Sequence, residues 1–431
     1  MKKYEEKMLK HKIINYIIII ATILCVYLII SDGVLIDFDT VSYVRAWDNL
    51  KSGEIDIWRT PSYPIILGIL KCCLGDYFMW ATIMIQFITF IISIKYFYIV
   101  AGKLINNEII VISITAFYAL YPCIPTWNNY ILTESFAVYG IIFFLYYIIK
   151  VYVDKSIKYH IHLLICILFL IFLRPAIIFI IPILLLILCI LGFKLSWAKT
   201  VRYGFISLFV VCTCLSGYIY LYQKKYGILY PTAVGVLNNY YIARMEGKIK
   251  PEMTNNPSLS LYIEKSIKEH GVEYTNGSGY DLGREGINAI QTYGPKNVSN
   301  LISESNFNSI SEQIKRFFHH IRKASQDKLF YTYNSRWDII SDITCMRMNV
   351  LYIMLLTYAI ILSYRMFRRK DIALFSILLL LFGAGHLFVI LFSCQNVWYR
   401  LIIPFTPVYL LMIGQLLSIL IVKETNKQFY I

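Results

Sequence analysis

Residues 13–30 read IINYIIIIATILCVYLII and carry no charge. Roughly 20 apolar residues in a helix are needed to cross the hydrocarbon core of a bilayer. Two later runs, residues 79–100 and 372–392, are long enough and apolar enough to do the same. Each of the three is therefore expected to cross a membrane as a helix.

The composition of the whole chain supports this interpretation. Of its 431 residues, 58% are apolar and only 16% are charged, which is too apolar for a water-soluble globular protein. The net charge of +15 comes from Lys and Arg in short segments between the apolar runs. Such placement sets the orientation of membrane helices and does not indicate nucleic-acid binding. The sequence predicts an all-α polytopic membrane protein with no nucleic-acid partner.

The apolar pattern predicts ten spans, at residues 12–30, 79–100, 109–122, 131–150, 161–173, 176–192, 203–222, 348–364, 372–393 and 401–421. Arg174 and Pro175 separate the fifth span from the sixth, because Pro disfavours a helical conformation in the residue before it. With ten spans and the N-terminus inside, the basic runs near Lys194 and Arg368 both face the cytoplasm, as the positive-inside rule requires. We therefore expect a multi-pass protein of the cell membrane with both termini in the cytoplasm.

Two longer hydrophilic regions then face outward, at residues 31–78 and 223–347. The chain is expected to divide into an N-terminal transmembrane module (1–222), an extracytoplasmic, mostly helical subdomain (223–347) and C-terminal transmembrane helices (348–431). The first outer loop, inside the N-terminal module, is expected to carry interfacial helices.

The most informative stretch in the first outer loop is IDFDTVSY, residues 36–43. Tyr43, Trp47 and Leu50 recur at helical spacing, which predicts a helix in the membrane interface with its aromatic face in lipid. Asp39 would stand at the N-terminus of that helix, where Asp is a favoured cap. Capping alone would explain this residue. Alternatively, an outward-facing carboxylate can act as a general base that takes a proton from an acceptor hydroxyl.

This loop resembles the first outer loop of the GT-C superfamily of membrane glycosyltransferases, which includes the protein O-mannosyltransferases and the lipid A aminoarabinose transferase. The family pattern is a carboxylate, often followed by Ser, with Tyr four residues on and then an Arg-x-Pro-x-Tyr-Pro run. The matching residues are Asp39, Tyr43, Arg59, Pro61, Tyr63 and Pro64. Thr40 departs from the usual Ser, and Ser62 stands where Gly is frequent.

Later segments that resemble the same families fall at predicted outer ends of spans. They are Tyr121-Pro122 through Leu132-Thr133-Glu134, Leu173-Arg174-Pro175, and Trp398-Tyr399-Arg400 with Pro404 and Pro407. The outer region 223–347 resembles no family that we can name.

The resemblance implies a donor sugar carried on a polyprenyl phosphate, an acceptor on the outer side and inversion at the anomeric carbon. It implies Asp39 as the base, with Asp37 as the reserve candidate because a two-residue shift would exchange them. Departure of the lipid phosphate calls for positive charge at the developing anion. The candidates for that charge are Arg59, Arg174 and Arg400, although snorkelling or structural salt bridges would also explain arginines at these places.

Further candidate substrate-binding residues are Tyr43, Tyr63 and Glu134, the last of which is equally expected as a helix-start carboxylate. Some relatives need a divalent cation and others do not, and Asp37 with Asp39 supplies too few ligands to decide. The acceptor, whether polymer, lipid or protein, stays open, and membrane lipids are expected partners.

The sequence also allows other functions, each tied to other residues. His386 lies inside the ninth span, where a neutral His hydrogen-bonded between helices is the simpler explanation. A polysaccharide polymerase or ligase acting on lipid-diphosphate-linked glycans would place its chemistry in the large outer region, on Arg284, Arg316, Arg322 or Arg336. A lipid or glycan transporter would show charges or broken helices at mid-membrane depth in paired halves.

Overall fold

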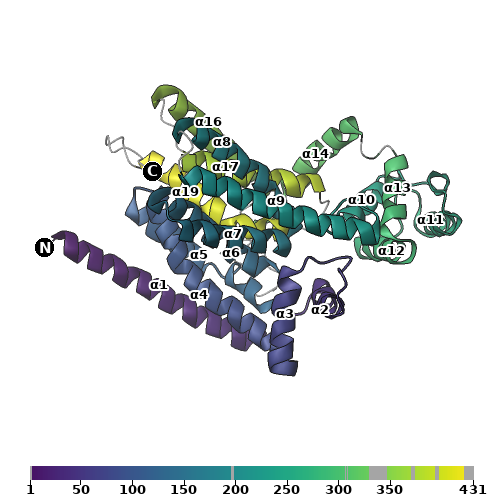
Figure 1. Cartoon of the computed structure of the whole chain (residues 1–431), viewed down its shortest axis with the longest axis horizontal. Helices are drawn as coiled ribbons and strands as arrows, with labels where there is room; N and C mark the ends of the chain where they lie inside the picture. Colours follow the sequence, from purple (N-terminus) through teal and green to yellow (C-terminus); the bar gives the residue numbers. More distant parts are fainter. Residues whose placement is uncertain are drawn as a thin grey trace.

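The computed structural model describes residues 2–195, 199–305, 307, 309–329, 347–369, 374–393 and 398–421. In these ranges the regular elements are helices, joined by turns and two isolated β-bridges. Figure 1 shows long helices side by side in one bundle and a smaller group of helices, α10 to α13, at one end.

The long apolar helices confirm the prediction of an all-α polytopic membrane protein. Their bounds are α1 Lys2–Asp32, α4 Phe78–Leu104, α5 Glu108–Leu120, α6 Glu134–Asp154, α7 Ile157–Leu173, α8 Ile180–Leu195, α9 Lys199–Tyr226, α16 Met348–Arg369, α17 Leu374–Ser393 and α19 Thr406–Ile421. Within the described residues, eight helical stretches are long and apolar enough to cross a membrane, and two shorter apolar helices accompany them. These ten coincide with the ten predicted spans, including the break at Arg174 and Pro175, where a 3-10 turn begins.

The remaining helices lie outside these spans or join them. They are α2 Phe38–Lys51, α3 Ser62–Leu74, α10 Val234–Met245, α11 Pro257–His270, α12 Gly279–Tyr293, α13 Pro295–Glu304, α14 Ile310–Ala324 and α18 Trp398–Ile402. The apolar α3 continues through a short turn into α4, and the two form one apolar helical stretch, Ser62–Leu104. The sequence-based assignment of α3 to a hydrophilic loop is wrong.

Helices α6 and α19 form the centre of the membrane bundle, since most of their residues are buried. Helix α6 packs tightly on α7 at Gly140, where an added Cβ would come within 2.6 Å of the Cδ2 atom of Leu170. Small residues allow this close approach between membrane helices. The outward faces of α1 and α9, by contrast, expose apolar side chains such as Ile23 and Phe209, as expected for a lipid-facing surface.

The smaller helical group has a core of its own. Its buried side chains come mainly from α10 to α13 and include Tyr240, Leu282 and Leu301. Trp58, from the segment that joins α2 to α3, is buried in the same core. The N–H of Ala233 also donates to the carbonyl of Ile57 at 2.9 Å. The segment that joins α2 to α3 therefore packs against this smaller helical group.

Helix α2 differs from the prediction in two respects. Its N-cap is Asp37, not Asp39: the Asp37 carboxylate accepts from the N–H of Asp39, and the Thr40 hydroxyl accepts from the N–H of Asp37, which is a capping box. The expectation that Tyr43 faces lipid is wrong, because Tyr43 is only 6% exposed and packs edge-on against Tyr63 at 5.0 Å. Helical spacing shows which residues share a face but not whether lipid or protein covers that face.

Candidate active site

The start of α2 is attached to the segment that precedes α6. Leu35 forms a β-bridge with Tyr130, and the N–H of Ile131 donates to the carbonyl of Leu35 at 3.2 Å. The Thr40 hydroxyl then donates to the carbonyl of Ile131 at 3.2 Å. These bonds bring Asp39, which follows the first span, beside the N-terminus of α6 and its first residue, Glu134.

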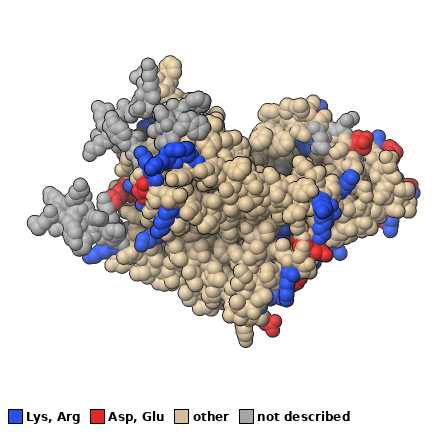
Figure 2. All heavy atoms as spheres, in the orientation of Figure 1, with Lys and Arg blue, Asp and Glu red and all other residues tan. Residues whose placement is uncertain are grey.

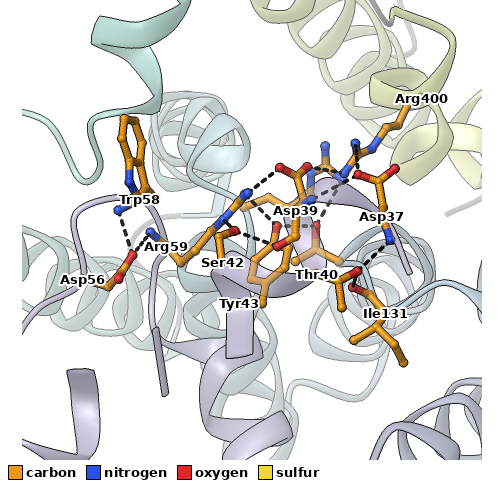
Figure 3. Close-up of polar contacts among 12 residues, drawn as sticks. Asp37, Asp39, Thr40, Ser42, Tyr43, Asp56, Trp58, Arg59, Ile131 and Arg400 are labelled. Carbon is orange, nitrogen blue, oxygen red and sulfur yellow. Dashed lines mark hydrogen bonds and ion pairs between the residues drawn. The ribbon is translucent and has the colours of Figure 1, made fainter. Parts of the chain in front are cut away.

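Asp39 lies between two arginines that come from opposite ends of the chain (Figure 3). Its Oδ1 atom is 2.5 Å from Nη2 of Arg59, and its Oδ2 atom is 2.7 Å from Nη2 of Arg400. Burial alone would raise the pKa of Asp39, but the two guanidinium groups outweigh it and hold that pKa well below its usual range. The side chain is 28% exposed, so a substrate can reach it. Asp39 is therefore ionised at neutral pH, and it is a weak base while both arginines hold it.

The position of Arg59 is fixed by its neighbours. The guanidinium donates to Ser42 Oγ at 2.7 Å and to the Tyr43 hydroxyl at 3.2 Å, and it lies 4.2 Å above the centre of the Tyr43 ring. The backbone N–H of Arg59 and that of Trp58 both donate to Oδ1 of Asp56 at 2.8 Å. Burial lowers the pKa of Arg59 by itself, but Tyr43 and Asp39 raise it more, so the group stays charged.

Glu134 holds the other two arginines together. It is fully buried, and its Oε1 atom is 2.5 Å from Nε of Arg400 and 3.2 Å from Nη1 of Arg174. Arg174 also donates to the hydroxyl of Thr133 at 3.3 Å, and that hydroxyl is 3.5 Å from the hydroxyl of Tyr43. An ionised group is buried at low cost only when it is paired in this way.

Arg400 is the centre of the cluster, because it faces three carboxylates. It contacts Asp39 and Glu134 directly, and Asp37 is 3.9 Å from its Nη1 atom. Together with Arg59 and Arg174, the cluster pairs three carboxylates with three guanidinium groups, so its formal charges cancel. A substrate phosphate would therefore have to compete with carboxylates for the arginines.

Two predicted residues play a different part. Tyr63 is completely buried, and its hydroxyl donates to Oε1 of Gln86 at 3.3 Å, so it supports Tyr43 from below and does not reach the open side of the site. Asp37 caps α2. The structure thus brings together Asp39, Glu134, Tyr43 and the three arginines, and it places Tyr63 behind them.

Asp56 and Gln86 also contribute to the site but were not among the predicted residues, and Thr133 was named only as the neighbour of Glu134. Asp56 precedes Trp58 and Arg59 by two and three residues, which is the spacing at which an Asp side chain accepts from backbone N–H groups, and this signal was readable. Gln86 donates to the carbonyls of Asn128 and Tyr130, at 2.7 and 3.0 Å, across about 40 residues of chain. A contact of that range leaves no local pattern.

The residues of the cluster do not fit a divalent cation. Within the described ranges, no three His, Cys, Asp or Glu side chains are grouped so that they could hold a metal ion. The carboxylates of Asp39 and Glu134 already accept from guanidinium groups.

Residues tied to the other interpretations lie elsewhere. His386 is buried, and its Nδ1 atom forms a hydrogen bond of 3.1 Å with the Tyr409 hydroxyl. Its ring stacks on Phe405, so the residue has the packing role expected for it. Arg316 lies over the ring of Phe307 at 3.4 Å and donates to the Phe307 carbonyl, so it is engaged in structure. Arg336 lies outside the described residues.

Comparison with known proteins gives limited likeness. No family model and no curated protein sequence matches the chain. The apo crystal structure of the Archaeoglobus fulgidus oligosaccharyltransferase is 14% identical with a TM-score of 0.49, over 94% of this chain and 50% of that one. The structure of archaeal oligosaccharyltransferase AglB from the same organism, in complex with an inhibitory peptide and a dolichol-phosphate, is 12% identical with the same TM-score and coverage. The chain thus spans half the length of these proteins, and a likeness of this degree identifies no function.

Proposed function

We propose that this chain is a membrane glycosyltransferase of the GT-C type that moves a sugar from a polyprenyl-phosphate donor to an acceptor outside the cytoplasm. One observation carries the proposal: Asp39 is held between Arg59 and Arg400, at the place where the sequence pattern resembles the catalytic loop of that superfamily. Charged clusters are costly to bury at the end of a membrane bundle, and for that reason they usually serve a function.

We infer the side of the membrane from the helix ends that meet at this cluster and from the basic segments. Helix α1 ends at Asp32, shortly before the start of α2, and α6 begins at Glu134. The lysine-rich leader lies at the other end of α1. Basic segments prefer the cytoplasm, so we place the cluster and the region 223–347 outside, and both termini inside.

In the proposed reaction, an acceptor hydroxyl attacks the anomeric carbon of the donor sugar. The new bond between this carbon and the acceptor oxygen forms as the bond to the phosphate oxygen breaks, with inversion. The hydroxyl proton passes to Asp39, and the polyprenyl phosphate leaves with the bonding electron pair. Guanidinium groups of the cluster stabilise the negative charge on the leaving phosphate.

The low pKa of Asp39 fits this reaction if the donor takes an arginine away from it. A donor phosphate that pairs with Arg400 or Arg59 removes one of the two charges that hold the carboxylate. The pKa of Asp39 then rises, and the carboxylate becomes a stronger base only when the donor is bound. Binding and catalysis are coupled in this way, without a separate activating group.

The test is the Asp39→Asn variant in the native host, with lipid mass spectrometry and surface-glycan analysis as readouts. The matched control is Asp48→Asn, because Asp48 lies on the same helix but is exposed and paired with Lys71 at 3.4 Å. We expect a polyprenyl monophosphate sugar to accumulate only with Asp39→Asn. Unchanged lipid pools and unchanged surface glycans in that variant would contradict the proposal.

A further inference from the structure

Helices α11 and α12 lie in the smaller helical group at one end of the molecule (Figure 1). A second polar site lies between them. It is a cavity of about 350 Å³, and none of its lining residues belongs to the cluster around Asp39. The lining side chains carry both charges and aromatic rings, namely Tyr262, Lys265, Glu269, His270, Arg284 and Asn288. Figure 2 shows charged residues of both signs around this end of the molecule. Few charged residues lie on the visible face of the middle of the membrane bundle (Figure 2).

The floor of this cavity is a buried polar network. Glu285 accepts from the hydroxyl of Tyr240 at 2.5 Å and from that of Ser266 at 2.6 Å. Arg244, which is fully buried, lies 3.5 Å from the same carboxylate and donates to the carbonyls of Gly271 and Val272. A buried ion pair of this kind contributes little net stability compared with apolar packing. It does fix the shape of the floor.

One wall of the cavity is held in a strained conformation. Tyr274 has a φ angle of 50°, in the left-handed region that a bulky residue rarely adopts. The centre of its ring is 5.2 Å from the guanidinium carbon of Arg244 and 4.5 Å from the centre of the His270 ring. Nδ1 of His270 is buried and has no hydrogen-bond partner among the described residues. Backbone strain beside an unsatisfied polar atom is typical of ligand sites.

The cavity is connected to the active site by a short series of contacts. Arg284, in the cavity wall, lies over the ring of Tyr280 at 5.8 Å. Tyr280 meets Phe38 edge-on at 6.1 Å, and Phe38 directly precedes Asp39 in α2. Both rings are largely exposed, Tyr280 at 60% and Phe38 at 59%. An extended ligand in the cavity would therefore lie along two exposed aromatic rings on its way to Asp39.

We propose that this cavity binds a saccharide and that, given the proposed transferase function, this saccharide is the acceptor. Hydroxyl-rich ligands need donors and acceptors together with an apolar ring face, and the cavity offers Lys265 and Arg284 as donors, Glu269 as an acceptor and tyrosine rings. A lipid acceptor would need a lining free of charged groups, whereas Lys265, Glu269 and Arg284 line this one. We therefore assign a glycan as the occupant, bound on α11 and α12 while its reactive hydroxyl reaches Asp39.

The experiment uses the full-length protein in detergent and fluorescently labelled oligosaccharides, released by mild acid from the envelope polysaccharide of the source cells. Binding is followed by fluorescence anisotropy. The test variant is Lys265→Ala with Arg284→Ala, and the control is Lys268→Ala. Lys265 and Lys268 are both on α11, are 75% and 73% exposed, and pair with Glu at i+4 or i−4, but only Lys265 lines the cavity.

We expect the dissociation constant to rise about tenfold or more in the double variant, because two charge-assisted hydrogen bonds are lost, and to stay unchanged in Lys268→Ala. Asn288→Trp, which fills the cavity from an exposed position on α12, should abolish binding. Equal binding by all these variants, or no binding by the unaltered protein, would overturn the proposal.

The transferase function is separable from this result. Saccharide binding requires no donor, so it can succeed even if transfer fails. If both hold, the cavity variants should raise the KM for acceptor and leave kcat unchanged, whereas Asp39→Asn should lower kcat and leave saccharide binding unchanged. Loss of kcat without a change in KM in the cavity variants would exclude the cavity as the acceptor site.

Discussion

Arg400 offers the sharpest test of how the cluster is held together. Substitution Arg400→Met keeps most of the side-chain volume but removes the charge. Glu134, which has no exposed surface, would keep the Thr133 hydroxyl at 3.5 Å, and its one remaining charged partner among the described residues would be Arg174 at 3.2 Å. Removing one partner from a buried ion pair costs about 3–5 kcal/mol, because the other charge stays buried. The loss of the contact between Arg400 and Asp39 adds less to this free-energy cost, because Asp39 is 28% exposed and keeps Arg59 as a partner.

A double-mutant cycle separates this cost from lost packing. Glu134→Gln removes the buried charge, so the variant with both substitutions should be more stable than the sum of the two single effects predicts. We expect a coupling energy of about 0.5–3 kcal/mol, the range for residues in one ion-pair network. The assay is denaturant unfolding of the purified protein in detergent, followed by tryptophan fluorescence. Lys71→Met, which breaks an exposed pair with Asp48, is the control and should cost less than about 1 kcal/mol.

Arg400→Lys completes the test. Lys keeps the charge but offers a single ammonium group, which cannot replace the Nε contact to Glu134 and the Nη2 contact to Asp39 together. Stability should fall less than with Met, whereas transfer should fall about 10²–10³-fold, the loss typical of a removed transition-state donor. Strictly additive stability effects, or full activity with Lys, would refute the central role given to Arg400.

Three further outcomes are expected. Gly140→Val should destabilise the bundle by about 1–3 kcal/mol in the same unfolding assay, because the new side chain meets Leu170. Tyr63→Phe should cost about 1 kcal/mol through its bond to Gln86 yet leave transfer rates intact; a rate loss would place Tyr63 in direct contact with substrate. The pKa of Asp39 is about 3.9 in the unfolded chain and lower in the folded protein, so the ionised carboxylate stabilises the fold above this pH. That stabilisation is lost as the pH falls below this value. Asp39→Asn should therefore flatten the acid side of a plot of unfolding free energy against pH, and an unchanged acid side would contradict the pairing.

The membrane helices could be predicted from sequence because hydrophobic length is a local property. The break at Arg174 and Pro175 was predicted for the same reason, since Pro acts on its own neighbours. The environment of Tyr43 was not predicted correctly, because helical spacing does not distinguish lipid from protein. The apolar helix α3 was not predicted either, because the polar residues on both sides of it led to the assignment of residues 31–78 as one hydrophilic loop.

Most residues of the polar cluster could be named from the sequence, but their geometry could not. The sequence pattern selected Asp39, Glu134 and the three arginines, but not which carboxylate each arginine would meet. Arg400 and Asp39 are 361 positions apart, and only the folded bundle places them 2.7 Å from one another. The distinction between Asp37 as cap and Asp39 as arginine partner also depended on where α2 begins, which differs by two residues from the prediction.

The most direct measurement uses the lipid that accumulates in cells carrying Asp39→Asn. Purified from those cells, it is given to the unaltered protein and to the Asp39→Asn protein, each in liposomes with acceptor polysaccharide. The account predicts that the unaltered protein releases polyprenyl phosphate and elongates or decorates the polysaccharide, while the variant does neither. If the unaltered protein leaves the lipid intact, or if the variant consumes it equally fast, then Asp39 and its arginines are not the centre of a sugar transfer.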